Sequence, residues 1–391
     1  MPSSLRDSRL RVTIVSRIYR PEASAASFFL GGVVDSFTAA GHDVEVLTAK
    51  MPQGLHPEPR GERVRTFPVL RDRNGYVRGY VQYMSFDIPL FFRLLFAKRP
   101  DVVFMEPPPT TGFVVRIVCG LRRIPYVYDA ADIWSDAADN ATGSQAVIRI
   151  LRGLERFAMK GAARIVTISQ GVADRIAELK VRTPVAVTGF GADTESFRYE
   201  EAPIEPVFLY AGSYSVWHGA EILIDAFAEF SESRPGYTLR FIGNSTERSR
   251  LAERAAELGV AGSVEFLHAI PAAELRPQLA RATASLATLK PGSGYDYAFT
   301  TKAYSALAAG CPVIFAGPGP TVPFIEDARR HVQAGAAVAY EAAAIAEAMR
   351  AIVDAAPDAA ERFATARWTQ EHHSMTSVAE RVRAVVEETL V

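Results

Sequence analysis

The stretch LKPGSGYDYAFTTKAYSALAAGCPVIF, residues Leu289–Phe315, decides the fold of this chain. Its first part contains Gly292 and Gly294, which mark a loop, and the small and apolar residues that follow predict a helix beginning near Ala298. Pro312 ends that helix because proline cannot continue one, and the apolar residues after it predict a short buried strand. The stretch therefore predicts a loop, a helix and a strand, the repeating unit of an α/β sheet.

The start of this helix is a candidate phosphate site. A helix N-terminus has free backbone N–H groups and a partial positive charge, which favour an anion. Lys302, in the first turns of the predicted helix, would add a full charge. From these residues alone, an ordinary helix–strand unit without a ligand is an equally good interpretation.

Within this stretch, Thr301–Ile314 resembles the donor-sugar motif of family 4 glycosyltransferases. Members close to the colanic-acid and capsule-type bacterial glycosyltransferases carry a similar run, Pro-Ser-Lys-x-x-Glu-Tyr-x-Ala-x-Gly-x-Pro-Val. The resemblance implies an α/β protein of the GT-B type, with two Rossmann-like doubly wound domains facing a cleft. It also implies a retaining, hexosyltransferase-like enzyme of polysaccharide biosynthesis that takes a nucleotide-diphosphate sugar as co-substrate. No cofactor and no metal site are expected.

The composition agrees with this interpretation. The chain has 391 residues, 49% hydrophobic and 22% charged, so it can build two ordinary cores. Its net charge of -1 argues against a nucleic-acid binder, which would have a basic excess. Cys119 and Cys311 lie in apolar segments without metal-ligand spacing, which favours reduced thiols in a cytoplasmic protein. We expect no signal peptide, and no apolar run reaches the roughly 18 residues that span a bilayer.

Alternating strand and helix patterns in both halves predict two α/β domains. A charged, proline-bearing run, Tyr199–Pro206, lies near mid-chain and is the best linker candidate. We therefore expect an N-terminal acceptor-side domain over residues 1–198 and a C-terminal nucleotide-sugar-binding domain over residues 199–371. Met375–Leu390 has the pattern of an amphipathic helix, and the resemblance implies that this terminal helix, about residues 372–391, crosses back to the first domain.

Four residues of the first half match family positions. Glu22 and Ala25 belong to a Tyr-x-Pro-Glu opening that leads into a helix, and in the family this loop faces the cleft. Asp132 and Trp134 follow the strand predicted at Ile124–Asp129, where open α/β sheets place their chemistry. The resemblance implies that Asp132 is catalytic and orients a hydroxyl, and that the other three are acceptor-side residues. Without the resemblance, Glu22 would be a solvated carboxylate and Asp132 a cap for the next segment.

In the second half, Gly212, Ser213 and His218 resemble the family's glycine-rich turn, which faces the donor diphosphate. Many relatives have an arginine and a lysine where this chain has Ser213 and His218. A protonated His218 would partly replace the lost charge, although a helix N-terminus disfavours that form. The alternative is a surface histidine at the start of a helix.

Three further residues complete the donor-side candidates. Gly243 follows the strand predicted at Thr238–Ile242, and Gly294 belongs to the loop before the motif. Lys302 matches the lysine of the motif, and the resemblance makes it the catalytic charge that stabilises the departing diphosphate.

Three further positions depart from the family pattern. Ala131 stands where many distant members have a histidine. Tyr297 and Ser305 stand where family 4 enzymes usually have two glutamates, near the transferred sugar and the nucleotide ribose, and we keep both as donor-binding candidates. Because a thymidine diphosphate sugar has no ribose 2′-hydroxyl, the second glutamate would matter less for such a donor. An enzyme that still uses a common donor is the other interpretation.

Two other functions stay open at this point. The lost glutamates and basic residues would also fit a non-catalytic GT-B subunit that supports a partner glycosyltransferase, although Lys302, Asp132 and Trp134 count against it. A sugar-nucleotide epimerase on the same fold would need a cluster of acid and base residues, which the sequence does not reveal. For a transferase, the acceptor would be a glycan, a lipid-linked molecule or a small molecule.

The segment Asp87–Arg99 predicts an apolar helix flanked by basic residues. Such a helix is either buried under the sheet or lies on a membrane surface. Because lipid-linked acceptors often meet this region in the family, we expect a cytoplasmic protein with possible peripheral contact at the inner face of the membrane. No nucleic-acid partner is expected, and no feature of the sequence indicates an oligomeric state.

Overall fold

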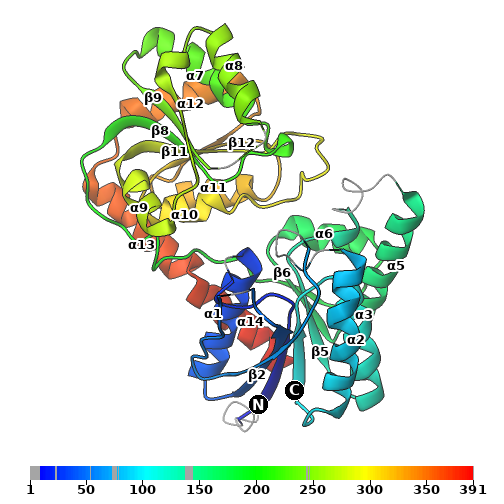
Figure 1. The fold of residues 1–391 in the computed structure, drawn as a ribbon. Helices are drawn as coiled ribbons and strands as arrows, with labels where there is room; N and C mark the ends of the chain where they lie inside the picture. The colour runs from blue at the N-terminus through cyan, green and yellow to red at the C-terminus, as the bar shows by residue number, and fades with distance from the viewer. Residues whose placement is uncertain are drawn as a thin grey trace. The chain divides into compact units, whose positions relative to one another are not determined.

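The computed structural model describes residues 9–22, 24–52, 54–72, 77, 79–136, 144–243, 245 and 247–390. The chain divides into two compact units, each with its own parallel sheet (Figure 1). Unit 1 comprises Met1–Phe190 and Met375–Val391, and unit 2 comprises Gly191–Ser374. Two parallel α/β units confirm the predicted fold class.

Unit 1 alternates strands and helices along the chain and ends with a helix that follows unit 2. Its elements are β1 (Arg11–Val15), α1 (Ala25–Ala39), β2 (Asp43–Ala49), β3 (Arg63–Phe67), α2 (Tyr80–Phe96), β4 (Val102–Met105), α3 (Pro109–Arg122), β5 (Tyr126–Ala130), α5 (Gln145–Gly161), β6 (Arg164–Thr167), α6 (Gln170–Glu178), β7 (Val185–Val187) and α14 (Met375–Glu388).

The sheet of unit 1 has the order β3-β2-β1-β4-β5-β6-β7, and all neighbours are parallel. Successive strands run outward from β1 to β2 and β3, and β4 then starts on the other side of β1. The strand order therefore reverses between β1 and β4. In open α/β sheets, this switch point at the carboxyl ends of the strands is where ligands bind.

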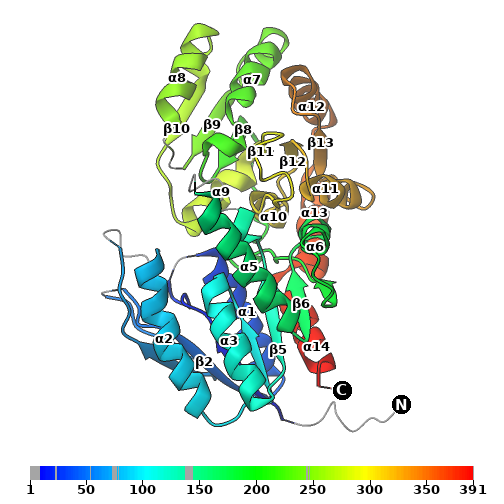
Figure 2. The ribbon, with the colours of Figure 1, turned by 90° about the vertical axis from the view of Figure 1, so that its right-hand side faces the viewer.

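Helices cover both faces of this sheet (Figures 1 and 2). Helices α1 and α14 pack against one face, over buried side chains such as Val12, Val46 and Phe104. Helices α2, α3 and α5 pack side by side on the other face. Strands buried on both sides explain why β4 is apolar without interruption.

Unit 2 repeats the same alternation. Its elements are β8 (Glu205–Ala211), η1 (Val216–His218), α7 (Glu221–Ser233), β9 (Thr238–Ile242), α8 (Arg248–Glu257), η2 (Ala261–Ser263), β10 (Val264–Leu267), α9 (Ala272–Arg281), β11 (Ala282–Thr288), α10 (Lys302–Ala308), β12 (Val313–Ala316), α11 (Thr321–Arg329), β13 (Gly335–Val338), α12 (Ala342–Ala355) and α13 (Ala359–His373).

The sheet of unit 2 has the order β10-β9-β8-β11-β12-β13, so its switch point lies between β8 and β11. Helices α7, α8 and α12 bury one face with a core that includes Phe208, Phe227, Phe241 and Met349. The glycines that end β8 and β9 and the helix α10 therefore belong to the carboxyl-terminal edge, where a ligand is expected.

Helix α10 is shorter than predicted. It begins at Lys302, four residues after the expected start at Ala298. The preceding residues form a loop instead, in which the Ala298 N–H donates to the Tyr295 carbonyl (2.7 Å) and the Thr300 N–H donates to Thr321 Oγ1 (2.9 Å). Because α10 has only seven residues, Lys302 itself matters more for a phosphate than the helix dipole does.

Helix α2 is longer than predicted. It begins at Tyr80, after Gly79 in a left-handed conformation (φ 108°), and it ends at Phe96. Pro89, which suits the first turn of a helix, lies in its interior, and this explains why the predicted start at Asp87 was wrong. Within the described ranges, every helix is too short or too polar to span a bilayer.

Candidate functional site

In unit 2, the carboxyl ends of β8 and β9 approach closely at two glycines. The Gly212 N–H donates to the Ile242 carbonyl (2.8 Å), and the Gly243 N–H donates to the Leu267 carbonyl (3.1 Å). A Cβ atom on Gly243 would collide with the Gly212 carbonyl, and Gly212 itself has a φ of 113°. Only glycine satisfies both the close contact at Gly243 and the positive φ at Gly212. These two residues therefore let the carboxyl ends of β8 and β9 approach each other closely.

Lys302, the first residue of α10, lies beside Gly212. Its Nζ donates to Tyr210 Oη (3.2 Å) and to the Ser213 carbonyl (3.4 Å), and it lies 4.7 Å from the centre of the Tyr210 ring. Burial lowers the pKa of the Lys302 ammonium to about 8. Among the described residues, no carboxylate lies within ion-pair distance of it. Lys302 is therefore a desolvated cation held by neutral groups.

A pocket of about 290 Å³ opens around this amine. Four of its lining residues carry hydroxyls, three are apolar, and none of those described is acidic. They are Ala211, Gly212, Ser213, Leu275, Leu279, Ser285, Thr301, Lys302 and Ser305. The pocket thus brings together Gly212, Ser213, Lys302 and Ser305, four of the donor-side residues expected from sequence.

His218 is neutral. Its Nδ1 accepts the N–H of Ser215 (3.1 Å), which leaves the ring proton on Nε2. Burial, and then the charge of Lys302, lower the pKa of His218 to about 3. This low pKa disfavours the protonated histidine considered from sequence, and the neutral His218 offers an N–H donor.

A row of aromatic rings continues from His218. The Trp217 ring lies 5.3 Å from the His218 ring and 5.3 Å from the Tyr295 ring, and Trp217 is 40% exposed. Tyr295 belongs to the loop after β11, which also carries Gly294 (φ 81°) and Tyr297. Gly294 and Tyr297 are not among the residues that line the Lys302 pocket.

In unit 1, Trp134 holds an arginine in place. The Arg17 guanidinium lies 4.6 Å from the Tyr83 ring centre and 5.4 Å from the Trp134 ring centre. The backbone of Trp134 is fixed in turn, because its N–H donates to Glu155 Oε1 (2.7 Å) of the buried Glu155 side chain. The predicted acceptor-side tryptophan is thus part of a cage around a buried cation.

Asp132 belongs to a cluster of three carboxyls. Burial raises the pKa of Glu106 to about 7, against the opposing effect of Arg17, and the Asp132 charge raises it further. Burial, together with Glu106 and Asp132, raises the pKa of Asp129 well above its usual range. Asp132 lies at the surface, but partial desolvation of its carboxyl still raises its pKa.

Glu22 and Ala25 lie apart from this cluster. Glu22 pairs with Arg71 (3.3 Å), so it is not the solvated carboxylate considered from sequence. Ala25 is the exposed first residue of α1, whose N-terminus is capped by Ser24 Oγ. Among the described residues, neither forms a hydrogen bond or ion pair with Glu106, Asp129 or Asp132.

Two family matches together span most of the chain. Residues 26–191 match the family described as "Glycosyl transferase 4-like domain", and residues 192–367 match "Glycosyl transferases group 1". A glycogen synthase of Mycobacterium tuberculosis (strain ATCC 25618 / H37Rv) is 25% identical over 357 residues, which cover 85% of this chain and 82% of that protein.

The chain belongs to the family 4 glycosyltransferases.

Solved structures confirm the GT-B fold of this family 4 glycosyltransferase. A sucrose-phosphate synthase from Thermosynechococcus elongatus has a TM-score of 0.73 at 17% identity, covering 97% of this chain and 99% of that one. WaaG, a glycosyltransferase involved in lipopolysaccharide biosynthesis, has a TM-score of 0.64 at 19% identity, covering 96% and 99%. At these identities the likeness shows the fold alone.

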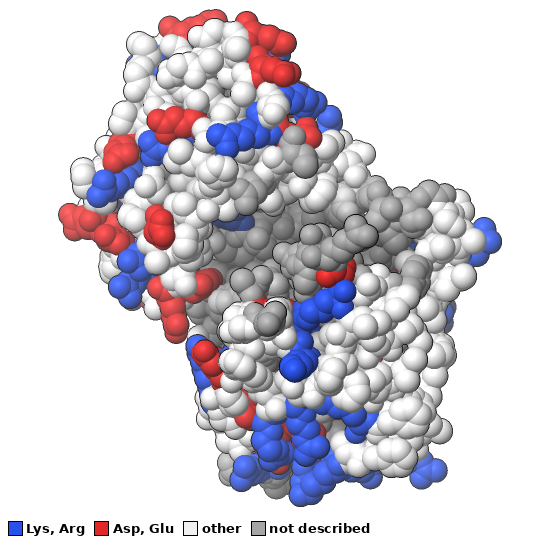
Figure 3. Space-filling model, viewed as in Figure 1, with Lys and Arg blue, Asp and Glu red and all other residues white. Residues whose placement is uncertain are grey.

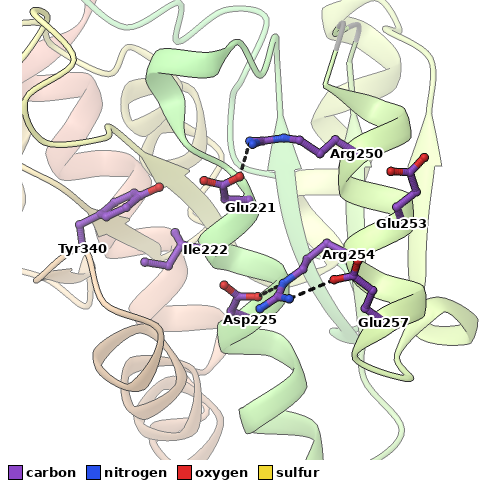
Figure 4. Close-up of a pocket in the computed structure, with 8 residues that line it drawn as sticks. All are labelled: Glu221, Ile222, Asp225, Arg250, Glu253, Arg254, Glu257 and Tyr340. Atoms are coloured by element: carbon purple, nitrogen blue, oxygen red, sulfur yellow. Dashed lines mark hydrogen bonds and ion pairs between the residues drawn. The ribbon is translucent and has the colours of Figure 1, made fainter.

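A second pocket of the glycosyltransferase lies between α7 and α8 of unit 2 (Figure 4). It has a volume of about 420 Å³, but both of its arginines pair with carboxylates. Arg250 contacts Glu221, and Arg254 lies 2.7 Å from Asp225 and 3.1 Å from Glu257. This pocket is a surface ion-pair network, whereas Lys302 lacks such a partner, so the Lys302 pocket is the better candidate for an anionic ligand.

Among the described residues of the glycosyltransferase, no group of three or more His, Cys, Asp and Glu side chains is arranged to hold a metal ion. The chemistry that the described groups offer is therefore charge stabilisation by Lys302, hydrogen bonding by hydroxyls and His218, and carboxyl chemistry in unit 1.

Proposed function

We propose that this family 4 glycosyltransferase binds a nucleotide-diphosphate sugar in unit 2 and transfers the sugar, with retention, to a hydroxyl acceptor bound by unit 1. The observation that carries the proposal is Lys302. A partly buried, desolvated ammonium without a carboxylate partner among the described residues is unfavourable unless an anion completes its surroundings. A diphosphate supplies that charge, and the pocket offers Ser213 and Thr301 hydroxyls as further donors to it.

Lys302 then acts on the leaving group. In a retaining front-face transfer, the departing phosphate takes the acceptor proton, so the protein must mainly stabilise the charge that develops on the diphosphate. Lys302 supplies that charge, and the neutral His218 supplies an N–H donor from Nε2. Removing one such group typically lowers kcat by about 10²–10³-fold.

On the donor side, Gly212, Gly243 and Gly294 shape the backbone around the nucleotide, and Tyr297 and Ser305 contact the sugar or ribose.

On the acceptor side, we assign Asp132 as a catalytic group that orients a hydroxyl, with Glu22, Ala25 and Trp134 lining the acceptor. The acceptor is a glycan, a lipid-linked molecule or a small molecule, and we infer a capsule-type role in polysaccharide biosynthesis from the motif at Thr301–Ile314.

Helix α2 supports a peripheral membrane location at the inner face of the cytoplasmic membrane. Five apolar residues spaced three or four apart are each at least 45% exposed along it: Val81, Met84, Ile88, Phe92 and Phe96. Lys and Arg atoms gather on unit 1 at the end where its strands begin (Figure 3). Arg93 lies in the last turn of α2, and Lys98 and Arg99 follow the helix in sequence. An exposed apolar stripe with flanking bases suits an anionic lipid surface.

Ser305 bears on the choice of nucleotide. It lines the Lys302 pocket as a hydroxyl where relatives have a carboxylate, so the pocket has no acceptor pair for two ribose hydroxyls. This favours a thymidine diphosphate sugar, whose ribose lacks the 2′-hydroxyl.

A thermal-shift panel tests these assignments, with uridine, guanosine, adenosine and thymidine diphosphates against the wild type, Lys302→Ala and Lys290→Ala. A ligand at 100 times its dissociation constant stabilises the folded state by about 2.7 kcal/mol. We expect one nucleotide to shift the wild type and Lys290→Ala but not Lys302→Ala. Lys290 is a suitable control because its amine already lies 3.8 Å from Glu221.

The panel also separates the alternatives. The deoxyribose assignment is supported if thymidine diphosphate shifts the melting temperature of the wild type and uridine diphosphate shifts that of Ser305→Glu. It is contradicted if uridine or guanosine diphosphate binds the wild type strongly and thymidine diphosphate does not. No shift by any nucleotide would contradict the donor site and favour a non-catalytic subunit.

A further inference from the structure

Glu106 lies at the switch point of the unit 1 sheet. It follows β4 directly, and its backbone N–H donates to the carbonyl of Val15, the last residue of β1 (2.9 Å). Its Oε2 accepts the hydroxyl of Ser16, the residue after β1 (3.0 Å). Main chain and side chain thus fix Glu106 between the two strands where the strand order reverses, the place where open α/β sheets bind ligands.

A rigid cation faces this carboxyl. Arg17 is 4% exposed, its Nη1 donates to the Val77 carbonyl (2.7 Å), and its guanidinium lies over the rings of Tyr83 and Trp134. Arg17 stabilises the ionised form of Glu106, yet among the described residues it forms no ion pair within 4.0 Å. The Val77 carbonyl and the two aromatic rings therefore hold the guanidinium near Glu106, and it forms no direct ion pair with the Glu106 carboxylate.

A second, independent feature marks this cluster as incomplete. Asp129, on β5, is 3% exposed, and within the described part of the chain its Oδ1 has no hydrogen-bond partner. The charges of Glu106 and Asp132 both raise the pKa of Asp129, so the three carboxyls belong to one cluster. Buried polar atoms are almost always paired, so an orphaned carboxyl oxygen here points to a donor that the protein does not supply.

We propose that Glu106, fixed by Ser16 and flanked by Arg17, Asp129 and Asp132, is the group in unit 1 that binds the hydroxyl of the acceptor. This inference rests on the proposed function and adds a binding residue and a substrate class to it. Glu106 accepts a hydrogen bond from the acceptor, and no proton leaves the acceptor to it, since the departing phosphate takes that proton.

The charges of the cluster restrict the acceptor. Above about pH 7, where Glu106 is ionised, its carboxylate repels a carboxylate or phosphate on the acceptor at this point. Neutral hydroxyls and ammonium groups donate hydrogen bonds and meet no such repulsion. We therefore expect a neutral sugar or an amino sugar at this end of the acceptor.

Ligand-observed saturation-transfer NMR on the full-length chain tests the inference. The probes are the methyl α-glycosides of glucose, galactose and mannose, with glucosamine as the cationic probe and glucose 6-phosphate as the anionic probe. The variants are Glu106→Gln, which keeps shape but removes the carboxylate, and Ser16→Ala, which removes its support. Glu45→Gln is the matched control, because Glu45 is also a buried carboxylate of this sheet but pairs with Arg65 (3.0 Å).

We expect at least one neutral or amino probe to bind the wild type at least tenfold more tightly than glucose 6-phosphate. Glu106→Gln should weaken that binding at least tenfold, Ser16→Ala should weaken it less, and Glu45→Gln should leave it unchanged. In a transfer assay, Glu106→Gln should raise the acceptor KM by a similar factor. Unchanged binding in Glu106→Gln, preference for glucose 6-phosphate, or no probe bound by the wild type would overturn the inference.

The nucleotide panel keeps the two proposals apart. Sugar binding that depends on Glu106 without any nucleotide shift would refute the proposed function and leave the site standing. A nucleotide shift that depends on Lys302, with sugar binding indifferent to Glu106, would refute this inference alone.

Discussion

Two desolvated ionisable groups of opposite charge lie at the two proposed sites, one in each unit. Burial lowers the pKa of Lys302 to about 8 and raises the pKa of Glu106 to about 7. In both cases desolvation acts on a side chain that lacks an ion-pair partner among the described residues. A bound anion would therefore stabilise the charged form of Lys302. A bound hydrogen-bond donor would likewise stabilise the charged form of Glu106.

The stability of unit 1 should depend on pH through Glu106. The unfolded chain releases this proton near pH 4.5, whereas the folded protein keeps it until about pH 7. Ionisation thus favours the unfolded state, and Glu106 lowers the free energy of unfolding progressively across this window, by up to about 3 kcal/mol. Glu106→Gln should therefore be more stable than the wild type at pH 8 and close to it at pH 4.5, as measured by urea unfolding.

The comparison between variants reports on this residue. Arg17 and Asp132 act on the charge of Glu106, and Glu106 in turn raises the pKa of Asp129, so the substitution also relieves that effect and the measured difference includes it. Glu45→Gln should show no such gain at pH 8. An equal stability difference between wild type and Glu106→Gln at pH 5 and pH 8 would show that the Glu106 carboxyl titrates near its ordinary value.

Sequence alone could find Lys302 but not Glu106. Lys302 stands inside a contiguous motif, so its role follows from a local pattern. Glu106, Ser16 and Asp129 are separated by tens of residues and meet only because β1, β4 and β5 are neighbours in the sheet. The neutral state of His218 was equally hidden, because it depends on the Ser215 N–H and on the nearness of Lys302.

At the scale of elements, strands were more predictable than helix ends. Strand β9 begins and ends where the sequence placed it, at Thr238 and Ile242. The edge strand β3 was not predicted, because its exposed face carries arginines such as Arg65 and gives no apolar run. The starts of α2 and α10 depended on Gly79 and on the Thr300–Thr321 contact, which no periodicity contains.

Helix α2 should bind anionic lipid through its exposed stripe. Full burial of one phenylalanine side chain is worth about 1.5–3 kcal/mol, so loss of Phe92 should weaken binding about tenfold or more. We expect the wild type to sediment with vesicles of three parts phosphatidylcholine and one part phosphatidylglycerol, and Phe92→Glu to remain in the supernatant. High salt should weaken the wild-type interaction, because it screens the flanking basic residues.

Phe363 provides the control for this experiment. It lies on α13 of unit 2 and is 52% exposed, against 54% for Phe92. Phe363→Glu should therefore sediment as the wild type does. Equal loss in both variants, or no sedimentation of the wild type, would contradict a lipid-binding role for α2.

At the scale of the whole chain, unit 1 is discontinuous in sequence. The chain leaves it at Phe190 and returns at Met375, so α14 packs on α1 only after unit 2 has been traversed. Gly32 permits this approach, because a Cβ atom there would collide with the Met375 side chain. The last helix is thus part of the unit 1 core.

A charge placed in that core should unfold unit 1 and spare unit 2. Val382 is fully buried against the unit 1 core, so Val382→Asp combines a lost apolar side chain with a buried carboxylate and should destabilise unit 1 by several kcal/mol. Ala384 is exposed on the same helix, and Ala384→Asp should change stability by less than about 0.5 kcal/mol.

Hydrogen exchange by mass spectrometry reports both units, because their peptides are resolved separately. In Val382→Asp we expect faster exchange in β1, β4 and α1, unchanged exchange in β8 and β11, and a retained nucleotide shift. Equal acceleration in both units would instead show that they unfold as a single cooperative body.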